Sequence, residues 1–472
     1  MSVTSDSLGV LIMAAGKGTR MHSDKPKVLQ SLLEEPVVYY ILDSVRRAGL
    51  SNVAVLVGHR GEMVEAYVRQ EWPDAEVVWQ HEQLGTGHAV KVAEAWWKQF
   101  DHVLVLNGDV PLVEPQTLAD LVKKHERYRP QCSLLSFNAD DPAGYGRIVR
   151  LADGGVRIVE HKEAEEEELS IHEINAGIYL FETKALSSVV DQLSPNNEQN
   201  EYYITDAVHL IDETEGDVNV VVCEDEAELQ GVNTPYDLAA TARALNKRII
   251  RAHMLNGLKC MDPGSTWIGP RAEFAPDVVV EPGVQIWGRS QIGNGSRIGA
   301  YTTLRNVAIG ENTTVFGPSV LVDAEIGNGA EIGPFAFLRS GVLMKDGSRA
   351  GRFVEIKNSA IGVGAKVPHL SYIGDATIGD GTNIGAGTVT CNYDGSEKHR
   401  TTIGANCFVG SDTMFVAPVS MGDNASTAAG SVITKDVPDG ALGIARARQT
   451  NIDDWQNRKG ITAKKTQKDK ES

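Results

Sequence analysis

A loop of glycines and cations at residues 16–20, Gly-Lys-Gly-Thr-Arg, has the composition of a phosphate-binding loop. Gly16 and Gly18 can adopt backbone angles that turn several N–H groups toward one point. The loop is neither a Walker A loop nor a dinucleotide-binding loop, because Met21 stands where the latter has its third glycine. We expect it to bind a triphosphate whose pyrophosphate leaves, although the loop alone also fits a tight turn with solvated lysines. Positive charge is gathered nearby on Lys17, Arg20, Lys25 and Lys27.

Other polar groups that could serve such a reaction follow apolar runs in the first half of the chain. The segment QLGTGHA at 83–89 is a second glycine loop, whose backbone and hydroxyl suit a planar base. Asp109 ends the run HVLVLNGD, and a carboxylate there can hold Mg²⁺ on phosphates or simply begin a helix or turn. Four further segments, GYGRI, VEHKEA, EINAGIY and GVNTPYDL, place polar side chains at 144–148, 159–164, 173–179 and 231–238.

The elements that must position these groups alternate between strand and helix. Apolar β-rich runs at 9–16, 53–58 and 102–109 predict buried strands, and the segments 36–50 and 61–70 carry helical spacing. This order is typical of a Rossmann-like α/β domain, with a parallel sheet covered on both faces. Ligands bind such sheets beyond the carboxyl ends of the strands, which is where the glycine loop and Asp109 fall.

The second half of the chain has a hexapeptide repeat. Aliphatic residues recur every six positions between Ile286 and Val409, usually followed by glycine, with an interruption near 391–399. Such a period predicts a triangular β-solenoid whose aliphatic side chains point into a stacked core. We therefore expect four segments, namely a nucleotidyltransferase domain at 1–235, a linker helix at 236–258, a solenoid at 259–452 and a disordered basic tail at 453–472.

Composition limits the remaining possibilities. The 472 residues are too many for one core, and a formal net charge of −18 argues against a general nucleic-acid binder. The five cysteines form no CxxC pair, which indicates a reducing compartment. We expect no signal peptide and no membrane span, because the first residues lack a basic start and no apolar run is long enough. The chain is thus expected to be cytoplasmic, with neither nucleic acid nor membrane as a partner.

The motifs of the first half resemble those of sugar-1-phosphate nucleotidylyltransferases. With the second half included, the chain to about Asn451 resembles bacterial bifunctional N-acetylglucosamine-1-phosphate uridyltransferases/glucosamine-1-phosphate acetyltransferases. Departures from the usual family pattern are Met13, Asn107 and Pro368, which stand where leucine, tyrosine and glycine are common. The resemblance implies that the solenoid is a left-handed parallel β-helix. The segments of the second half that carry the resemblance are FVEIKNS (353–359), PHLSYIGDA (368–376), NIGAGTVTCNYDG (383–395) and FVGSDTMFVAP (408–418).

For the first half, the resemblance implies uridylyl transfer from UTP to N-acetylglucosamine 1-phosphate. Arg20 and Lys27 would stabilise phosphate charge, while Asp109 and Asn233 would bind Mg²⁺ through hard oxygen donors. Within the site, Gln80, Gly85 and Thr86 would read uracil. Gly146, Glu160 and Asn175 would hold the sugar. The implied UTP and sugar-nucleotide set is Met13, Ala14, Ala15, Gly16, Lys27, Gln80, Gly85, Thr86, Asn107, Gly108, Asp109, Gly146, Glu160, Asn175 and Asn233.

For the second half, the resemblance implies acetyl transfer from acetyl-CoA to glucosamine 1-phosphate, so that the two reactions together make UDP-N-acetylglucosamine. An ammonium cannot attack a thioester, and His369 is the natural base because imidazole titrates near neutral pH. Glu355 would orient the imidazole. The sugar-phosphate set is Arg339, Lys357, Tyr372 and Asn383, and the acetyl-CoA set is Ala386, Asn392, Tyr393, Ser411, Ala429 and Arg446. Solenoids of this kind usually form homotrimers with sites between subunits.

Two other functions fit parts of the same sequence. One is a sugar nucleotidylyltransferase whose solenoid is only structural or regulatory, but such a module has no need of His369 or Lys357. The other is a non-catalytic solenoid scaffold joined to a nucleotide sensor, which would release no pyrophosphate.

Overall fold

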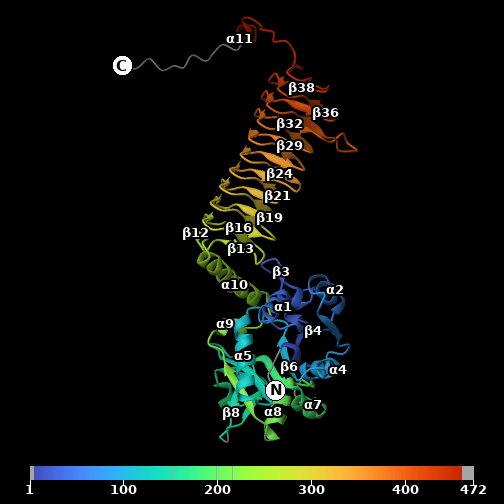
Figure 1. Ribbon diagram of the computed structural model, residues 1–472, viewed down its shortest axis with the longest axis vertical. Helices are drawn as coiled ribbons and strands as arrows, with labels where there is room; N and C mark the ends of the chain where they lie inside the picture. The colour runs from blue at the N-terminus through green and yellow to red at the C-terminus, as the bar shows by residue number, and fades with distance from the viewer. Residues whose placement is uncertain (1–4, 153, 198, 215, 460–472) are drawn as a thin grey trace, which may run out of the picture. The chain divides into compact units, whose positions relative to one another are not determined.

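The computed structural model describes residues 5–459 except 153, 198 and 215, and these residues form two compact units (Figure 1). The first unit comprises the described residues up to Ala252 together with Ile268–Pro270. The second comprises His253–Trp267 and the described residues from Arg271 onward. None of the helices in the described part of the chain combines the length and the apolar character needed to cross a membrane.

A nine-stranded mixed sheet forms the middle of the first unit. Its main path runs β11-β7-β10-β6-β1-β4-β5, and the hairpin β8–β9 joins it through β10. β1 is parallel to both β4 and β6, so that Gly9 lies opposite Asn52 on one side and Val103 on the other. The strands are β1 (Leu8–Ala14), β4 (Asn52–Val57), β5 (Glu76–Trp79), β6 (His102–Asn107), β7 (Cys132–Asn138), β8 (Arg147–Arg150), β9 (Val156–Val159), β10 (Glu173–Glu182) and β11 (Val218–Val222), with a separate two-stranded pair β2 (Ser31–Leu32) and β3 (Glu35–Pro36).

Helices cover both faces of this sheet, which confirms the α/β layering predicted from the alternating elements. Val10 and Ile12 of β1 point into one core, whereas Leu11 points into the other. The first core is closed by α1 (Val37–Arg47), α2 (Gly61–Glu71) and α5 (Pro115–Tyr128). The second is closed by α3 (Thr86–Val92), α4 (Glu94–Trp97), α7 (Thr183–Val189) and α8 (Ile204–Glu213). Shorter helices are η1 (Ser5–Ser7), η2 (Thr19–Met21), η3 (Lys27–Leu29), α6 (Glu166–Leu169), η4 (Val190–Gln192) and α9 (Glu226–Leu229).

The prediction of a parallel sheet holds for β1, β4, β5 and β6 but is wrong for β10. This strand runs antiparallel to both β6 and β7. Between β7 and β10 the chain forms the β8–β9 hairpin and the one-turn helix α6. Because antiparallel neighbours need no crossover helix, this connection places β10 between β6 and β7 in the reversed direction.

The second unit is a parallel β-helix, as the hexapeptide repeat predicts. Most successive coils pair at offsets of 17 or 18 residues, with Arg297 beside Thr314 and Thr314 beside Glu331. The hexapeptide aliphatics are buried from Ile286 to Val409. One face consists of β12 (Lys259–Cys260), β15 (Val279–Val280), β18 (Arg297–Ile298), β20 (Thr314–Val315), β22 (Glu331–Ile332), β25 (Arg349–Arg352), β28 (Lys366–His369), β31 (Asn383–Ile384), β34 (Phe408–Val409), β37 (Ser426–Thr427) and β39 (Leu442–Gly443).

The other two faces belong to one continuous seventeen-stranded sheet. Its strands are β13 (Trp267–Ile268), β14 (Glu273–Phe274), β16 (Gln285–Trp287), β17 (Gln291–Ile292), β19 (Thr303–Ile309), β21 (Val320–Ile326), β23 (Phe337–Leu338), β24 (Val342–Met344), β26 (Glu355–Lys357), β27 (Ala360–Ile361), β29 (Tyr372–Gly374), β30 (Ala376–Ile378), β32 (Val389–Cys391), β33 (Thr401–Ile403), β35 (Met414–Val416), β36 (Val419–Met421) and β38 (Val432–Ile433). The two longest of these strands, β19 and β21, continue across the junction between faces.

Buried hydroxyl groups at the coil corners complete the solenoid core. Ser296 Oγ donates to the carbonyl of Gly310 at 2.8 Å and accepts the backbone N–H of Thr313 at 3.0 Å. Thr313 repeats both contacts one coil further on, with Gly327 and Ala330. These hydroxyls satisfy backbone groups that a buried corner would otherwise leave unpaired.

The interruption in the repeat is a loop that leaves the coil and returns to it. Asn383 pairs with Phe408, a wider step than elsewhere, because residues 392–400 project between β32 and β33. The backbone N–H of His399 donates to the carbonyl of Asn392 at 2.8 Å and closes the loop at its base. The coil therefore resumes in register after the insertion.

The segment predicted as a linker helix forms α10 (Pro235–Leu255), which ends just before Gly257. Gly257 has a φ of 103°, which suits a residue that follows a helix end. The tail predicted to be disordered, 453–472, lies mostly outside the described residues. Its described part contains the one-turn helix α11 (Trp455–Arg458).

Candidate active sites

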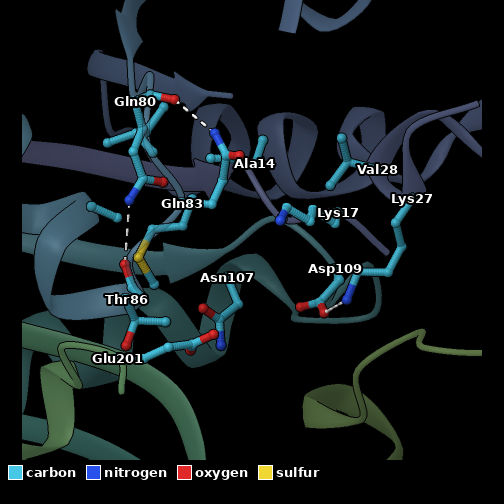
Figure 2. Close-up of a pocket in the computed structure, with 16 residues that line it drawn as sticks. Ala14, Lys17, Lys27, Val28, Gln80, Gln83, Thr86, Asn107, Asp109 and Glu201 are labelled. Atoms are coloured by element: carbon cyan, nitrogen blue, oxygen red, sulfur yellow. Dashed lines mark hydrogen bonds and ion pairs between the residues drawn. The ribbon is translucent and has the colours of Figure 1, made fainter. Parts of the chain in front are cut away.

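A cavity of about 410 Å³ opens at the carboxyl ends of β1 and β6 in the first unit (Figure 2). The glycine loop that follows β1 and the Asp109 turn that follows β6 both contribute to its wall. The predicted site residues that line it are Met13, Ala14, Ala15, Gly16, Lys27, Gln80, Gly85, Thr86, Asn107 and Asp109. The loops that the sequence analysis singled out separately are thus neighbours in the fold.

A second cavity, of about 210 Å³, adjoins the first and shares Thr86, Asn107 and Asp109 with it. Its wall includes Gly146 beside the β8–β9 hairpin and Asn175 in β10. The predicted residues found here in addition to the shared three are Gly146, Glu160, Asn175 and Asn233. The two cavities together offer room for a nucleotide in one part and a smaller polar group in the other.

Cations and oxygen donors converge where the two cavities meet. Lys27 Nζ donates to Oδ2 of Asp109 and lies 3.0 Å from Oδ1 of Asn233. Arg20 Nη2 donates to the same Asn233 oxygen at 2.9 Å. The Asp109 and Asn233 oxygens thus accept from the same ammonium. Mg²⁺ prefers such carboxylate and amide oxygens as ligands, together with oxygens of a bound phosphate. The donor set therefore suits a metal held jointly by the protein and a nucleotide.

The two glycines of the first loop differ in what they require. Gly18 has a φ of 59°, and a Cβ there would lie 2.7 Å from the Cβ of Lys27. A Cβ on Gly16 would meet nothing within 4 Å, and Gly16 lines the cavity. Gly18 is thus required by the fold of the loop, whereas Gly16 leaves space on the ligand side.

Amides at the opposite end of the first cavity suit a planar, hydrogen-bonding base. Gln83 Nε2 donates to the carbonyl of Gln80 at 3.0 Å (Figure 2). Gln80 Nε2 lies 3.0 Å from Nδ1 of His88. Thr86 Oγ1 accepts the backbone N–H of Ile204 at 3.0 Å, so it is anchored by α8. These groups are held by the protein before any ligand arrives.

The smaller cavity is lined by a half-buried carboxyl and two anchored side chains. Thr205 Oγ1 donates to Glu160 Oε1 at 3.3 Å, and burial raises the pKa of Glu160 above its ordinary value. Asn175 Nδ2 donates to the hydroxyl of Tyr179 at 2.5 Å, and Asn175 Oδ1 accepts the N–H of Gly177. Such fixed polar groups suit the hydroxyl and amide groups of a sugar.

Two predicted residues of the first site, Arg20 and Gly108, line neither cavity. Arg20 is connected to the site by its hydrogen bond to Asn233. The N–H of Gly108 donates to the Met13 carbonyl at 2.8 Å and so holds the loops after β1 and β6 together. Conversely, Lys17, Gln83 and Glu201 line the larger cavity but were not assigned a role there. Lys17 was visible as part of the basic loop. No sequence pattern around Glu201 indicates that it lines a binding site.

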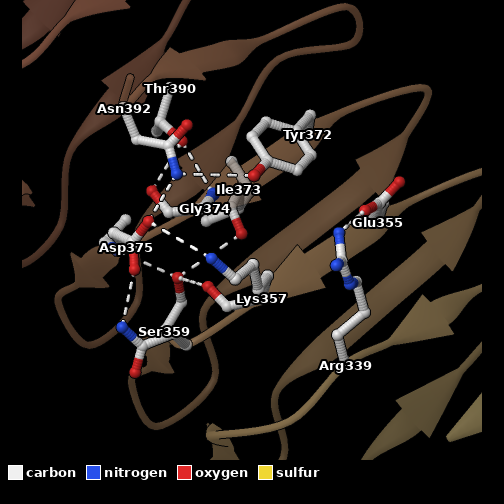
Figure 3. Close-up of polar contacts among 12 residues, drawn as sticks. Arg339, Glu355, Lys357, Ser359, Tyr372, Ile373, Gly374, Asp375, Thr390 and Asn392 are labelled. Atoms are coloured by element: carbon white, nitrogen blue, oxygen red, sulfur yellow. Dashed lines mark hydrogen bonds and ion pairs between the residues drawn. The ribbon is translucent and has the colours of Figure 1, made fainter. Parts of the chain in front are cut away.

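A second polar cluster lies on the β-helix and centres on Asp375 (Figure 3). Asn392 Nδ2 donates to Asp375 Oδ2 at 2.5 Å and lies 3.4 Å from the hydroxyl of Tyr372. Lys357 Nζ lies 3.8 Å from the same Asp375 oxygen. The structure therefore brings together three predicted residues, Lys357, Tyr372 and Asn392, around a carboxylate that the sequence analysis did not single out.

The base predicted for acetyl transfer stands at the end of β28. His369 is exposed and pairs in register with Arg352 on the preceding coil. Glu355, predicted to orient the imidazole, instead accepts from Arg339 Nη1 at 2.8 Å (Figure 3). Among the described residues, none forms a hydrogen bond with the His369 imidazole, and the side chain is accessible to solvent.

The remaining predicted residues of this unit lie on neighbouring coils. Asn383 is on β31, beside the strand that ends in His369. The carbonyls of Ala386 and Ser411 accept the N–H groups of Asp412 and Gly430, so these residues follow one another along the solenoid. Arg446 Nη1 donates to the carbonyl of Ala429 at 2.9 Å, and Tyr393 lies on the inserted loop with its side chain exposed.

Fold and sites together define a nucleotidyltransferase-like α/β domain joined to a hexapeptide-repeat transferase. Residues 10–169 match the family model of the MobA-like NTP transferase domain, and residues 400–435 match that of the bacterial transferase hexapeptide (six repeats). The solved structure of HddC from Yersinia pseudotuberculosis matches 50% of this chain and 99% of its own at 18% identity. Its TM-score of 0.39 is too low to support an inference.

Curated relatives match almost the whole chain. The protein of Carboxydothermus hydrogenoformans named bifunctional protein GlmU is 44% identical over 446 residues, or 94% of this chain and 99% of the relative. Proteins of the same name from Heliobacterium modesticaldum and Streptomyces avermitilis are 44% and 42% identical over 95% of this chain, covering 98% and 94% of their own. The chain belongs to the family of bifunctional GlmU proteins.

Proposed function

We propose that this chain makes UDP-N-acetylglucosamine in two reactions, one on each unit. The β-helix transfers an acetyl group from acetyl-CoA to glucosamine 1-phosphate, and the α/β unit then transfers a uridylyl group from UTP to the product. The observation that carries this proposal is the presence of two separate polar sites in a chain whose full-length relatives are named bifunctional. UTP and acetyl-CoA are cytoplasmic metabolites, and the product serves peptidoglycan and lipopolysaccharide synthesis, so we place the enzyme in cytoplasmic cell-wall biogenesis.

Uridylyl transfer needs positioning and charge neutralisation rather than a protein nucleophile. A phosphate oxygen of the sugar phosphate, held in the smaller cavity, attacks the α-phosphorus of UTP in line. The bond to the β-phosphate oxygen breaks and pyrophosphate leaves. Lys27 lies where the two cavities meet, and Arg20 is linked to it through Asn233. Both cations stabilise the charge that builds up on the phosphates.

Asp109 and Asn233 would hold Mg²⁺ at this junction, where the metal would neutralise charge on the phosphates. Both oxygens accept from Lys27 in the structure, so the ammonium stands where the metal charge would be. On nucleotide binding Lys27 exchanges Asp109 for a phosphate oxygen. Its flexible four-carbon stem allows that movement without a change in the backbone.

Acetyl transfer follows a different course on the β-helix. His369 takes a proton from the ammonium of glucosamine 1-phosphate, and the free amine then attacks the thioester carbon. A carbon–nitrogen bond forms, the carbon–sulfur bond breaks, and coenzyme A leaves as the thiol after proton return. Lys357 and Arg339 supply the positive charge for the sugar phosphate. Acetyl-CoA would contact Ala386, Ser411 and Ala429, which lie on successive coils of the β-helix.

The proposal includes a homotrimer held by the solenoid. Four large apolar side chains, Tyr301, Phe335, Phe353 and Leu370, stand on left-handed corner residues and are more than half exposed. Phe335 and Phe353 stack with ring centroids 5.1 Å apart. An exposed apolar row of this kind suits burial against a second copy of the chain. Light scattering on the full chain tests this proposal, and a clean monomer at micromolar concentration would count against it.

Product identification tests the function as a whole. The full chain is supplied with glucosamine 1-phosphate, acetyl-CoA, UTP and Mg²⁺, and the products are weighed by mass spectrometry. UDP-N-acetylglucosamine, coenzyme A and pyrophosphate are expected. Uridylyl transfer without acetylation would instead support a nucleotidylyltransferase with a structural solenoid, and release of neither pyrophosphate nor coenzyme A would exclude both.

A further inference from the structure

The carboxylate of Asp375 is held between three successive coils of the β-helix. Oδ1 accepts from Asn358 Nδ2 at 2.6 Å on the preceding coil, and Oδ2 accepts from Asn392 Nδ2 at 2.5 Å on the following coil. Lys357 Nζ approaches Oδ2 to 3.8 Å (Figure 3). Asp375 is only 8% exposed and has a φ of 49°. Such a carboxylate has little freedom to move.

Part of this arrangement is an ordinary corner of the solenoid. Asn306 Nδ2 donates to Asp323 Oδ1 at 3.0 Å, and both residues have left-handed backbones like Asp375. The same ladder continues through Gly341 to Asn358, Asp375 and Asn392. Asp323, however, is exposed. If Asp375 served only to support the corner, we would expect its surroundings to match those of Asp323.

What distinguishes Asp375 is that its partners are residues assigned to different substrates. Lys357 belongs to the set for the sugar phosphate and Asn392 to the set for acetyl-CoA, while Asn392 also lies 3.4 Å from the Tyr372 hydroxyl. The 3.8 Å separation holds the Lys357 ammonium by charge and leaves its N–H groups available to a phosphate. Although burial opposes ionisation, hydrogen bonds from Asn358 and Asn392 keep the pKa of Asp375 below its ordinary value.

We propose that Asp375 is a positioning residue that fixes Lys357 and Asn392 relative to each other, and so sets the amino-sugar phosphate and acetyl-CoA subsites in one geometry. The inference rests on the acetyl transfer proposed above. Asp375 itself touches neither substrate. It acts as the common acceptor through which one subsite is aligned with the other.

The test compares Asp375→Asn with Asp323→Asn, which makes the same change on the same corner ladder away from the cluster. An amide in place of the carboxylate keeps the volume, but it presents an N–H₂ group to one of the two asparagine donors and removes the charge facing Lys357. We expect the KM values for both glucosamine 1-phosphate and acetyl-CoA to rise about 10-fold in Asp375→Asn, since the charge that faces Lys357 and accepts from Asn392 is lost. The pH profile of kcat should keep its shape, because the base is untouched.

The readouts separate this role from a structural one. Asp323→Asn should leave both KM values unchanged, and uridylyl transfer should be unaffected in both variants. Unchanged KM values in a folded Asp375→Asn protein, or equal losses in the two variants, would overturn the proposal. If Asp375→Asn does not fold, Asn358→Ala removes one fixed contact of the carboxylate while keeping its charge. A rise in both KM values is then expected, and no rise would contradict it.

Failure of the underlying function is recognised separately. Wild-type enzyme that binds neither glucosamine 1-phosphate nor acetyl-CoA in calorimetry would refute acetyl transfer itself. Wild-type enzyme that binds and acetylates, with Asp375→Asn indistinguishable from it, refutes only the positioning role.

Discussion

Lys27 and Asp109 lie 82 positions apart in the chain and form an ion pair at the carboxyl ends of two adjacent parallel strands. Both side chains are mostly buried, with 16% and 19% exposed. Asn233 adds its amide oxygen to the same ammonium. These contacts therefore hold the site together without a ligand, and the metal and nucleotide proposed above would exchange them rather than create new ones.

Replacing Asp109 with alanine should lower uridylyl transfer by at least about 100-fold, because the phosphates lose the charge neutralisation that this carboxylate anchors. Rates measured over a Mg²⁺ titration provide the check. Asp120→Ala is the matched control, since Asp120 is half exposed on α5 and contacts only Gln116 and Lys123 of the same helix among the described residues. A near-normal rate of Asp109→Ala at ordinary Mg²⁺ would exclude the proposed role.

Adding a methyl group at Gly16 should affect ligand binding but not folding. The new Cβ has no protein neighbour within 4 Å and enters the nucleotide cavity, so the KM for UTP should rise about 10-fold or more. Gly18→Ala provides the contrast, because its φ of 59° and the nearby Lys27 Cβ should cost about 1–2 kcal/mol of folding stability. Steady-state kinetics and urea unfolding distinguish the two effects. Equal unfolding midpoints for the two variants would contradict this reading.

The two chemistries should separate at His369. His369→Ala removes an exposed side chain and leaves the solenoid core intact, so acetyl transfer should fall at least about 100-fold. Uridylyl transfer from supplied N-acetylglucosamine 1-phosphate should stay near its original rate. Higher pH should partly restore acetylation, because more of the substrate amine is then neutral. Parallel loss of both activities would indicate damage to the fold or coupling between the units.

Acid should weaken the α/β unit through a buried histidine. His125 is 1% exposed, Nδ1 lies 2.9 Å from Ser133 Oγ, and the His102 ring stands 5.2 Å away. Burial, with a smaller effect of His102, lowers the pKa of His125 to about 4. Between pH 6.5 and 4 the unfolded chain therefore binds more protons than the folded one, and stability falls as pH falls.

The size of this effect can be measured by difference. Wild-type protein should lose about 2 kcal/mol more than His125→Gln between pH 7.5 and 5 in urea unfolding, since carboxylates contribute to both proteins alike. Glutamine keeps an amide near Ser133 but does not titrate. Stability curves of the two proteins that run parallel across this range would show that His125 is not the group responsible.

The sequence predicts the environment of a residue where its spacing is compatible with only one structure. Ile292 and Ile298 recur at six residues, and only an inward direction buries both. Asp109 and the 16–20 loop end apolar runs, and adjacent parallel strands bring such ends together. Spacing alone does not identify residues such as Glu160 and Lys357, which were predicted from the resemblance to a family.

Other features depend on contacts that no local pattern encodes. Ser296 is buried because it satisfies Thr313 one coil away, and a serine in a repeat looks the same whether it faces water or the core. The reversed direction of β10 follows from the β8–β9 hairpin rather than from the alternation of its own residues. Glu355 was expected beside His369, but Arg339 offers it a stronger partner.

The short step between coils, most often 17 or 18 residues, also bears on how the chain acquires its structure during synthesis. Each coil finds its hydrogen-bonding partners in the stretch made immediately before it, so the solenoid can lengthen coil by coil as the ribosome releases it. The sheet of the α/β unit is different, because β6 must find β1 and β10 must later enter between β6 and β7. One half of the protein can grow continuously, whereas the other has to wait until most of its chain is available.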